Sequence, residues 1–138
     1  MGYRVMNGED AAWSPSNAMK VMNADIAGQL ELSELSARMW RLAPGQANTR
    51  HRQGHELELY VLLEGTGRIR VGDDVLTLEP IAAVAVDPDT VRQVFNDTDR
   101  EQLWLIVGSP RDRLTPEDAA WVYPDGREAM PPELSPDS

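Results

Sequence analysis

The fold is decided by residues 43–67, which read APGQANTRHRQGHELELYVLLEGTG and contain both histidines of the chain. The polar and glycine residues of this stretch stand at fixed intervals. Five residues separate Gly45 from His51, one separates His51 from Gln53, four separate Gln53 from Glu58, and six separate Glu58 from Gly65. An imidazole, an amide and a carboxylate thus lie within eight positions, which makes this stretch the candidate functional site.

The expected strand geometry groups these side chains on one face. His51, Gln53 and His55 share a face of an extended segment, because side chains alternate along a strand. Glu58 has the other parity, so it joins that face only where a loop or bulge intervenes. Gly54 is suited to permit one.

The flanking sequence predicts consecutive strands. Short runs rich in Val, Ile, Leu, Tyr and Trp alternate with Gly, Pro, Asn and Asp, which is typical of strands and turns. The predicted strands are residues 36–42, 58–63, 66–71, 74–78, 83–86, 92–96 and 101–107. The sequence VGDDV at 71–75 predicts a tight hairpin. Several short strands at this spacing favour an all-β sandwich or barrel.

The spacing around His51 resembles the first motif of the cupin superfamily, in which Gly, His-x-His, Glu and Gly stand at those intervals. Here Gln53 replaces the second His. Residues 78–96 resemble the second motif in their hydrophobic frame and in Pro88, Thr90 and Asn96, but Arg92 stands where the family has its last metal-binding His. The resemblance implies a cupin-type jelly roll, or double-stranded β-helix barrel, of the small single-domain (cupin_2-like) kind.

The chain is predicted to form one domain over residues 1–138, since its length suffices for a single core. Residues 1–34 are expected to be an N-terminal arm, 35–108 the β-barrel core, and 109–138 a C-terminal helix and Pro-rich tail. Thr115 followed by Pro116 predicts the start of that helix, which can run to about Trp121.

The resemblance also implies how a metal would be held. In cupins, two or three His and one Glu bind a divalent ion such as iron, manganese, nickel or zinc. This chain offers His51 and Glu58, with Gln53 and Arg92 in the other two places. Because Arg cannot bind a cation, the site is expected to be degenerate, and no cofactor is assigned. A three-ligand set of His51, His55 and Glu58 remains an alternative if His55 replaces Gln53.

Two orientations are open for Arg92. It either turns inward and pairs with Glu58, which neutralises a carboxylate that is otherwise buried alone, or it points to solvent at the start of its strand. The aromatic residues Trp40, Tyr60, Phe95 and Trp104 are expected to pack in the core.

The sequence is compatible with three functions. The first is binding of a small polar metabolite in a pocket formed by His51, Gln53, His55, Glu58 and Arg92. The second is catalysis: the resemblance implies a metal-dependent oxygenase, isomerase or decarboxylase using His51, His55 and Glu58, or a metal-free enzyme with His51 as general base. The third is a structural or regulatory module that acts through dimerisation.

The composition of the chain excludes several classes of binding partner and several kinds of site. The chain has 13 basic and 23 acidic residues and a net charge of −10, so nucleic acid and anionic membrane surfaces are poor partners. It has no cysteine, which excludes disulfides and thiolate metal sites. No run of apolar residues is long enough for a signal peptide or membrane span. We therefore expect a cytoplasmic protein. The resemblance to small single-domain cupins further implies a homodimer.

Overall fold

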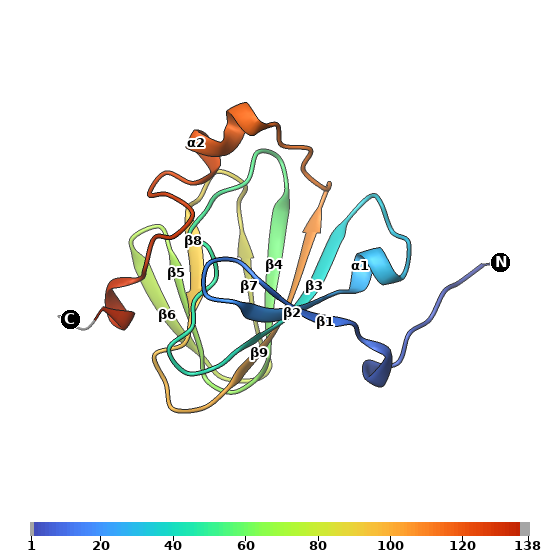
Figure 1. The fold of residues 1–138 in the computed structure, drawn as a ribbon, viewed down its shortest axis with the longest axis horizontal. Coiled ribbons are helices and arrows are strands. Elements are labelled where there is room, and N and C mark those ends of the chain that lie inside the picture. The colour runs from blue at the N-terminus through green and yellow to red at the C-terminus, as the bar shows by residue number, and fades with distance from the viewer. Residues whose placement is uncertain (1, 136–138) are drawn as a thin grey trace.

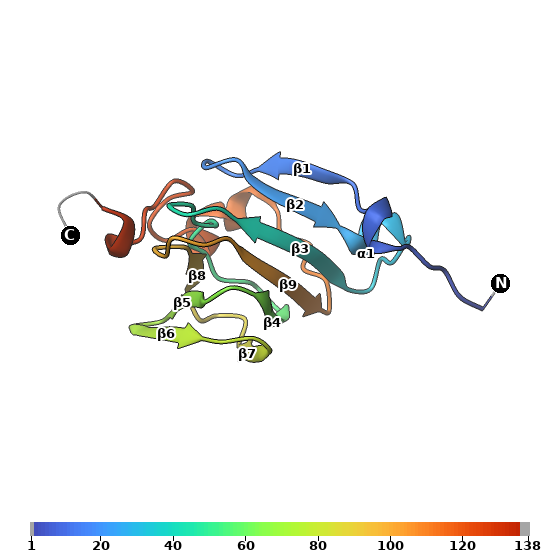
Figure 2. The same ribbon diagram turned by 90° about the horizontal axis from the view of Figure 1, so that it is seen from below.

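Two antiparallel sheets form the barrel in the computed structural model, which describes residues 2–135 (Figure 1). The larger sheet has the strand order β1 (Trp13–Ser16), β2 (Val21–Asp25), β3 (Ser36–Leu42), β9 (Gln102–Ser109), β4 (Leu57–Glu64) and β7 (Ala82–Val86). The smaller sheet has the order β6 (Asp74–Leu78), β5 (Gly67–Val71) and β8 (Arg92–Phe95). In Figure 2, β5 and β6 lie below β1, β2 and β3.

The helices are all short. They are α1 (Ile26–Gln29), α2 (Ala119–Val122) and 3₁₀ turns at Gly8–Asp10, Pro116–Asp118 and Pro132–Leu134. Thr115 precedes the second of these turns, and its backbone N–H and hydroxyl both donate to Asp118. Within residues 2–135, no helix is long and apolar enough to cross a membrane.

The all-β jelly-roll prediction with a short C-terminal helix is confirmed. Each of the seven predicted strands exists with ends within two residues of those expected, and β5 and β6 form the predicted hairpin. Two further strands, β1 and β2, lie in the region expected to be an arm, and they extend the larger sheet through β3. They lack a clear apolar–polar alternation, and Pro15 is tolerated because β1 is an edge strand.

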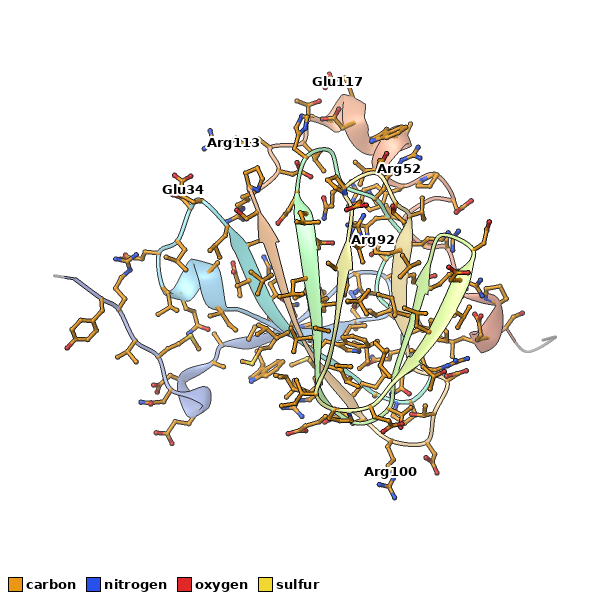
Figure 3. The ribbon with its side chains drawn as sticks, turned by 180° about the vertical axis from the view of Figure 1, so that it is seen from behind. Glu34, Arg52, Arg92, Arg100, Arg113 and Glu117 are labelled. Carbon is orange, nitrogen blue, oxygen red and sulfur yellow. The ribbon has the colours of Figure 1, made fainter. Side chains whose placement is uncertain are left out.

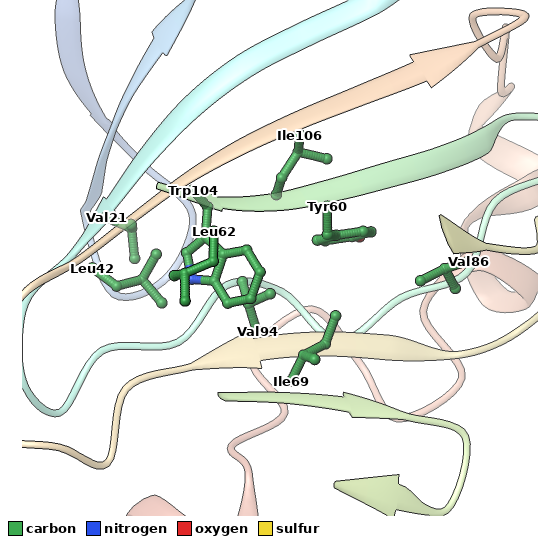
Figure 4. Packing of buried hydrophobic residues seen from close by; sticks show 9 residues of the cluster. All are labelled: Val21, Leu42, Tyr60, Leu62, Ile69, Val86, Val94, Trp104 and Ile106. Atoms are coloured by element: carbon green, nitrogen blue, oxygen red, sulfur yellow. The ribbon is translucent and has the colours of Figure 1, made fainter. Parts of the chain in front are cut away.

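The core fills the space between the sheets. Its members share near-complete burial and are shown in Figure 4: Val21, Leu42, Tyr60, Leu62, Ile69, Val86, Val94, Trp104 and Ile106. The ring of Tyr60 meets that of Trp104 edge-on, with centroids 6.4 Å apart. Along β4, the buried residues Glu58, Tyr60 and Leu62 alternate with outward-facing neighbours. The strand that carries the core therefore also carries a carboxylate inward.

Candidate functional site

A cavity of about 550 Å³ opens between the sheets. Its walls come from β3, β4, β8 and β9, and its rim comes from residues 48–53 and from the C-terminal segment 111–127 that includes α2. The volume lies within the range of small-molecule sites. Trp40, Val94 and Ile106 supply apolar wall, Leu114 and Val122 supply apolar rim, and most other lining side chains are polar.

Three side chains converge on one oxygen of Glu58. The Tyr60 hydroxyl donates to Glu58 Oε1 at 2.8 Å, Arg92 Nε lies 3.4 Å from this oxygen, and His51 Nε2 lies 3.6 Å from it. The backbone fixes the arrangement, because His51 and Arg92 exchange N–H···O bonds of 3.0 and 2.8 Å in an isolated bridge. The bend at Gly54 and His55, before β4 begins, lets Glu58 join His51 despite its parity.

Arg92 takes the inward orientation. Its side chain is fully buried, and Nη1 donates to the carbonyl oxygens of Pro88 at 3.0 Å and Thr90 at 2.7 Å (Figure 3). The turn between β7 and β8 thus holds the guanidinium beneath Glu58. Arg92 does not itself line the cavity surface.

His51 is fixed through both ring nitrogens. Nδ1 lies 2.9 Å from the carbonyl oxygen of Thr49, so this nitrogen must carry the hydrogen of that bond. Nε2 then faces Glu58, and the contact is an ion pair when Nε2 is also protonated.

The protonation states follow from these contacts. Burial alone would raise the pKa of Glu58, but the hydrogen bond and charge of His51, with Arg92 and Tyr60, outweigh it and hold this pKa below its ordinary value. Burial, together with the neighbouring Glu58 charge, raises the pKa of Tyr60 well above its ordinary value. At neutral pH, Glu58 is therefore a carboxylate and Tyr60 a neutral donor.

Glu56 is a site residue that sequence reasoning missed. It is 5% exposed, lines the cavity and accepts a hydrogen bond from the Ser36 hydroxyl. Its side chain lies over Gly108, where an added Cβ would stand 2.0 Å from Glu56 Oε1, so a larger residue at 108 would displace it. Burial raises the pKa of Glu56, and the charge of Glu58 adds to the rise. The signal was its two-residue spacing from Glu58, which puts both on one strand face.

Gln53 and His55 have different surroundings. Gln53 lines the cavity, whereas His55 is exposed and is not part of its lining. Asp112 fixes this bend, since its two carboxylate oxygens accept the backbone N–H groups of Gly54 and His55 at 2.8 and 2.7 Å. Of the five residues expected at the pocket, the structure groups His51, Glu58 and Arg92, with Gln53 on the same cavity and His55 outside it.

The residues present do not fit a divalent metal. No group of three or more His, Asp or Glu side chains within the described 2–135 range is arranged to hold an ion. His55 does not join His51 and Glu58, and the buried guanidinium of Arg92 lies 3.4 Å from the Glu58 carboxylate.

Comparisons with known proteins identify the family and the fold. A model of the cupin domain family matches residues 38–108, slightly more than half of the chain. No curated protein matches the chain.

Similar solved structures share the fold. They include a cupin-superfamily sugar phosphate isomerase from Silicibacter pomeroyi (18% identity, TM-score 0.70, 78% of this chain and 76% of that one). A predicted oxalate decarboxylase from Thermotoga maritima has 16% identity and a TM-score of 0.69 over 78% of this chain and all 100% of that one. A Thermus thermophilus protein has 26% identity and a TM-score of 0.57 over 79% of this chain and 91% of that one.

Proposed function

The chain belongs to the cupin family, and from this premise we propose that it binds a small polar metabolite in its barrel cavity without the help of a bound metal. The observation that carries the proposal is Arg92, which is fully buried with Nε 3.4 Å from Glu58 Oε1. A guanidinium keeps its charge at every accessible pH, so Glu58 already has its counter-ion.

The charge of Arg92 also opposes a metal at Glu58. Two unit charges 4 Å apart interact with about 4 kcal/mol at an effective dielectric constant near 20, and a divalent ion doubles that repulsion. The enzyme alternative based on His51, His55 and Glu58 is further weakened because the side chain of His55 is exposed.

The cavity lining supports a polar ligand of small size. Polar groups such as Gln53 and Asn48 stand beside the apolar walls, the combination that orients small molecules in binding sites. Two similar structures are named for small polar substrates, as a sugar phosphate isomerase and a predicted oxalate decarboxylase. Their identities below 20% transfer no activity, but the kind of ligand agrees with the proposal.

The test is the melting temperature of chelator-treated protein against a panel of hydroxy acids, sugar phosphates and polyols. A ligand at 100 times its Kd adds about 2.7 kcal/mol to the unfolding free energy, so we expect at least one compound to raise Tm by several degrees. Gln53→Trp, which fills the cavity, should abolish the response. Asp73→Trp, in the β5–β6 turn, should retain it.

Two results would contradict the proposal. A Tm response that appears only after iron, manganese, nickel or zinc is added would favour the metal-dependent enzyme. No response under either condition would favour the structural module.

A further inference from the structure

Two arginine side chains on the cavity rim lack an anionic partner. Arg111 and Arg127 both line the cavity, and within residues 2–135 neither guanidinium forms an ion pair or hydrogen bond. Arg127 packs over the ring of Tyr123 at 4.2 Å, which directs it without neutralising it.

Arginines with no polar side-chain partner are a minority in the part of the chain that the structure describes. Acidic residues outnumber basic ones 23 to 13, and six arginines are ion-paired with carboxylates. In the described part of the chain, only Arg100, Arg111, Arg113 and Arg127 have a guanidinium with neither an ion pair nor a hydrogen bond. Two of these four, Arg111 and Arg127, line the same cavity.

The carboxylates of the lining are occupied by the protein itself. Asp112 accepts the backbone N–H groups at the Gly54 bend, Glu58 lies beside Arg92, and Glu56 accepts the Ser36 hydroxyl. Each lining carboxylate thus already has a hydrogen-bond or ion-pair partner within the protein, whereas the guanidinium groups of Arg111 and Arg127 have none.

We propose that the ligand carries an oxyanion, a carboxylate or a phosphate, which Arg111 and Arg127 bind at the rim. This inference rests on the proposed binding function and names its ligand class. The planar guanidinium matches both oxyanions bidentately. With a net charge of −10, the chain as a whole repels small anions, so an anion needs local cationic donors such as these two guanidinium groups.

Gln53, on the same rim, provides a neutral polar group for the rest of the ligand. The side-chain amide of Gln53 has no hydrogen-bond partner among the described residues and lines the cavity, so it offers both a donor and an acceptor. An amide of this kind suits a hydroxyl. The ligand class is a small hydroxylated acid or phosphate ester.

The experiment titrates three probes with one carbon skeleton: glycerol, glycerate and glycerol 3-phosphate. Binding is followed by ¹H–¹⁵N spectra of the full chain, including the arginine Nε–H signals. We expect at least one anion to bind about tenfold or more tightly than glycerol, since charge-assisted hydrogen bonds are worth this much. The tighter of the two anions identifies carboxylate or phosphate as the group recognised.

Matched double variants test the assignment. Arg111→Gln with Arg127→Gln should lose about tenfold or more of that affinity, and the corresponding Lys pair should retain part of it. Arg100→Gln with Arg113→Gln removes the same charge outside the cavity and should leave the affinity unchanged (Figure 3).

Three results would overturn the inference: equal affinity for glycerol and both anions, an equal loss in the control pair, or no shift of cavity signals with either anion. Neutral binding that persists in all variants would overturn the oxyanion alone and leave the proposed function standing. The proposed function is tested separately by the melting-temperature experiment, and it would be contradicted by the outcomes given there.

Discussion

Arg92 determines what the carboxylate of Glu58 can do. With Arg92 replaced by Met, Glu58 would be buried with only Tyr60 and His51 as partners, and three backbone carbonyls would lose a donor. Breaking a buried pair by removing one partner is expected to lower the free energy of unfolding by about 3–5 kcal/mol. Urea unfolding measures this.

A double-mutant cycle provides the control. Glu58→Gln added to Arg92→Met should cost less than the sum of the single losses, because the orphaned charge is then absent. Additive losses would show that the two side chains do not interact.

The pKa values of Glu56 and Glu58 shift in opposite directions, so the two residues should affect the pH dependence of stability in opposite ways. The pKa of folded Glu58 lies below the ordinary 4.5, so its stabilisation is present above pH 4.5 and is lost as pH falls through the folded pKa. Folded Glu56 has a pKa above 4.5, so its contribution is present below pH 4.5 and is lost as pH rises through that higher pKa.

Two variants separate these contributions. Glu56→Gln should increase the unfolding free energy at pH 7, with the gain shrinking toward pH 4. Glu58→Gln should decrease it at pH 7, with the loss shrinking below pH 4.5. Parallel pH profiles for the two variants, measured by urea unfolding, would show that their environments do not differ as described.

The identity of several site residues could be predicted from the sequence, but the orientation of Arg92 could not. The motif spacing marked His51, Gln53 and Glu58, but the direction of Arg92 depended on the fold, because only the β7–β8 turn provides carbonyls to hold its guanidinium. Tyr60 was expected in the core. It is there, and its hydroxyl also reaches Glu58.

At the scale of elements, two turns with left-handed glycines differ in their surroundings. Gly65, after β4, has φ +83°, and an added Cβ would lie 2.3 Å from the backbone oxygen of Glu101. Gly72, in the β5–β6 hairpin, has φ +59° and nothing within 4 Å of that position.

Alanine substitutions should therefore differ in effect. Gly72→Ala should lower the unfolding free energy by about 1–2 kcal/mol through backbone conformation alone. Gly65→Ala should lower it by clearly more, because the backbone of the loop before β9 must also move. Equal losses in thermal or urea unfolding would contradict the close approach.

The strands could be predicted from the sequence where the pattern of apolar and turn residues is local. Alternation and turn residues located the strands between residues 36 and 109, whereas β1 and β2 depend on pairing with β3. The rim was not predictable for the same reason: Arg111 and Arg127 reach the cavity only through the course of the C-terminal segment around α2.

For the whole molecule, the outer face of the larger sheet predicts self-association. Leu57 is 49% exposed and Leu59 is 42% exposed on β4, next to β7, which is an edge strand. A second copy of the chain packed on this face would cover both the apolar side chains and the edge. We expect light scattering to show a dimer. Leu59→Lys should raise the Kd of dimerisation about tenfold or more, since burying a leucine contributes about 1.5–3 kcal/mol.

The control for this prediction is Val75→Lys, an exposed apolar position on β6 of the other sheet. A wild-type protein that remains monomeric over a wide concentration range would contradict the prediction, as would an equal effect of both variants.

The central claim is that Glu58 pairs with Arg92 rather than with a metal, and the most direct test is metal stoichiometry. Plasma mass spectrometry should be performed on untagged protein as purified and after incubation with iron, manganese, nickel and zinc salts. We expect far less than one metal ion per chain in every sample, because Arg92 already pairs with Glu58. Near-stoichiometric metal that is lost in both His51→Ala and Glu58→Ala would contradict it.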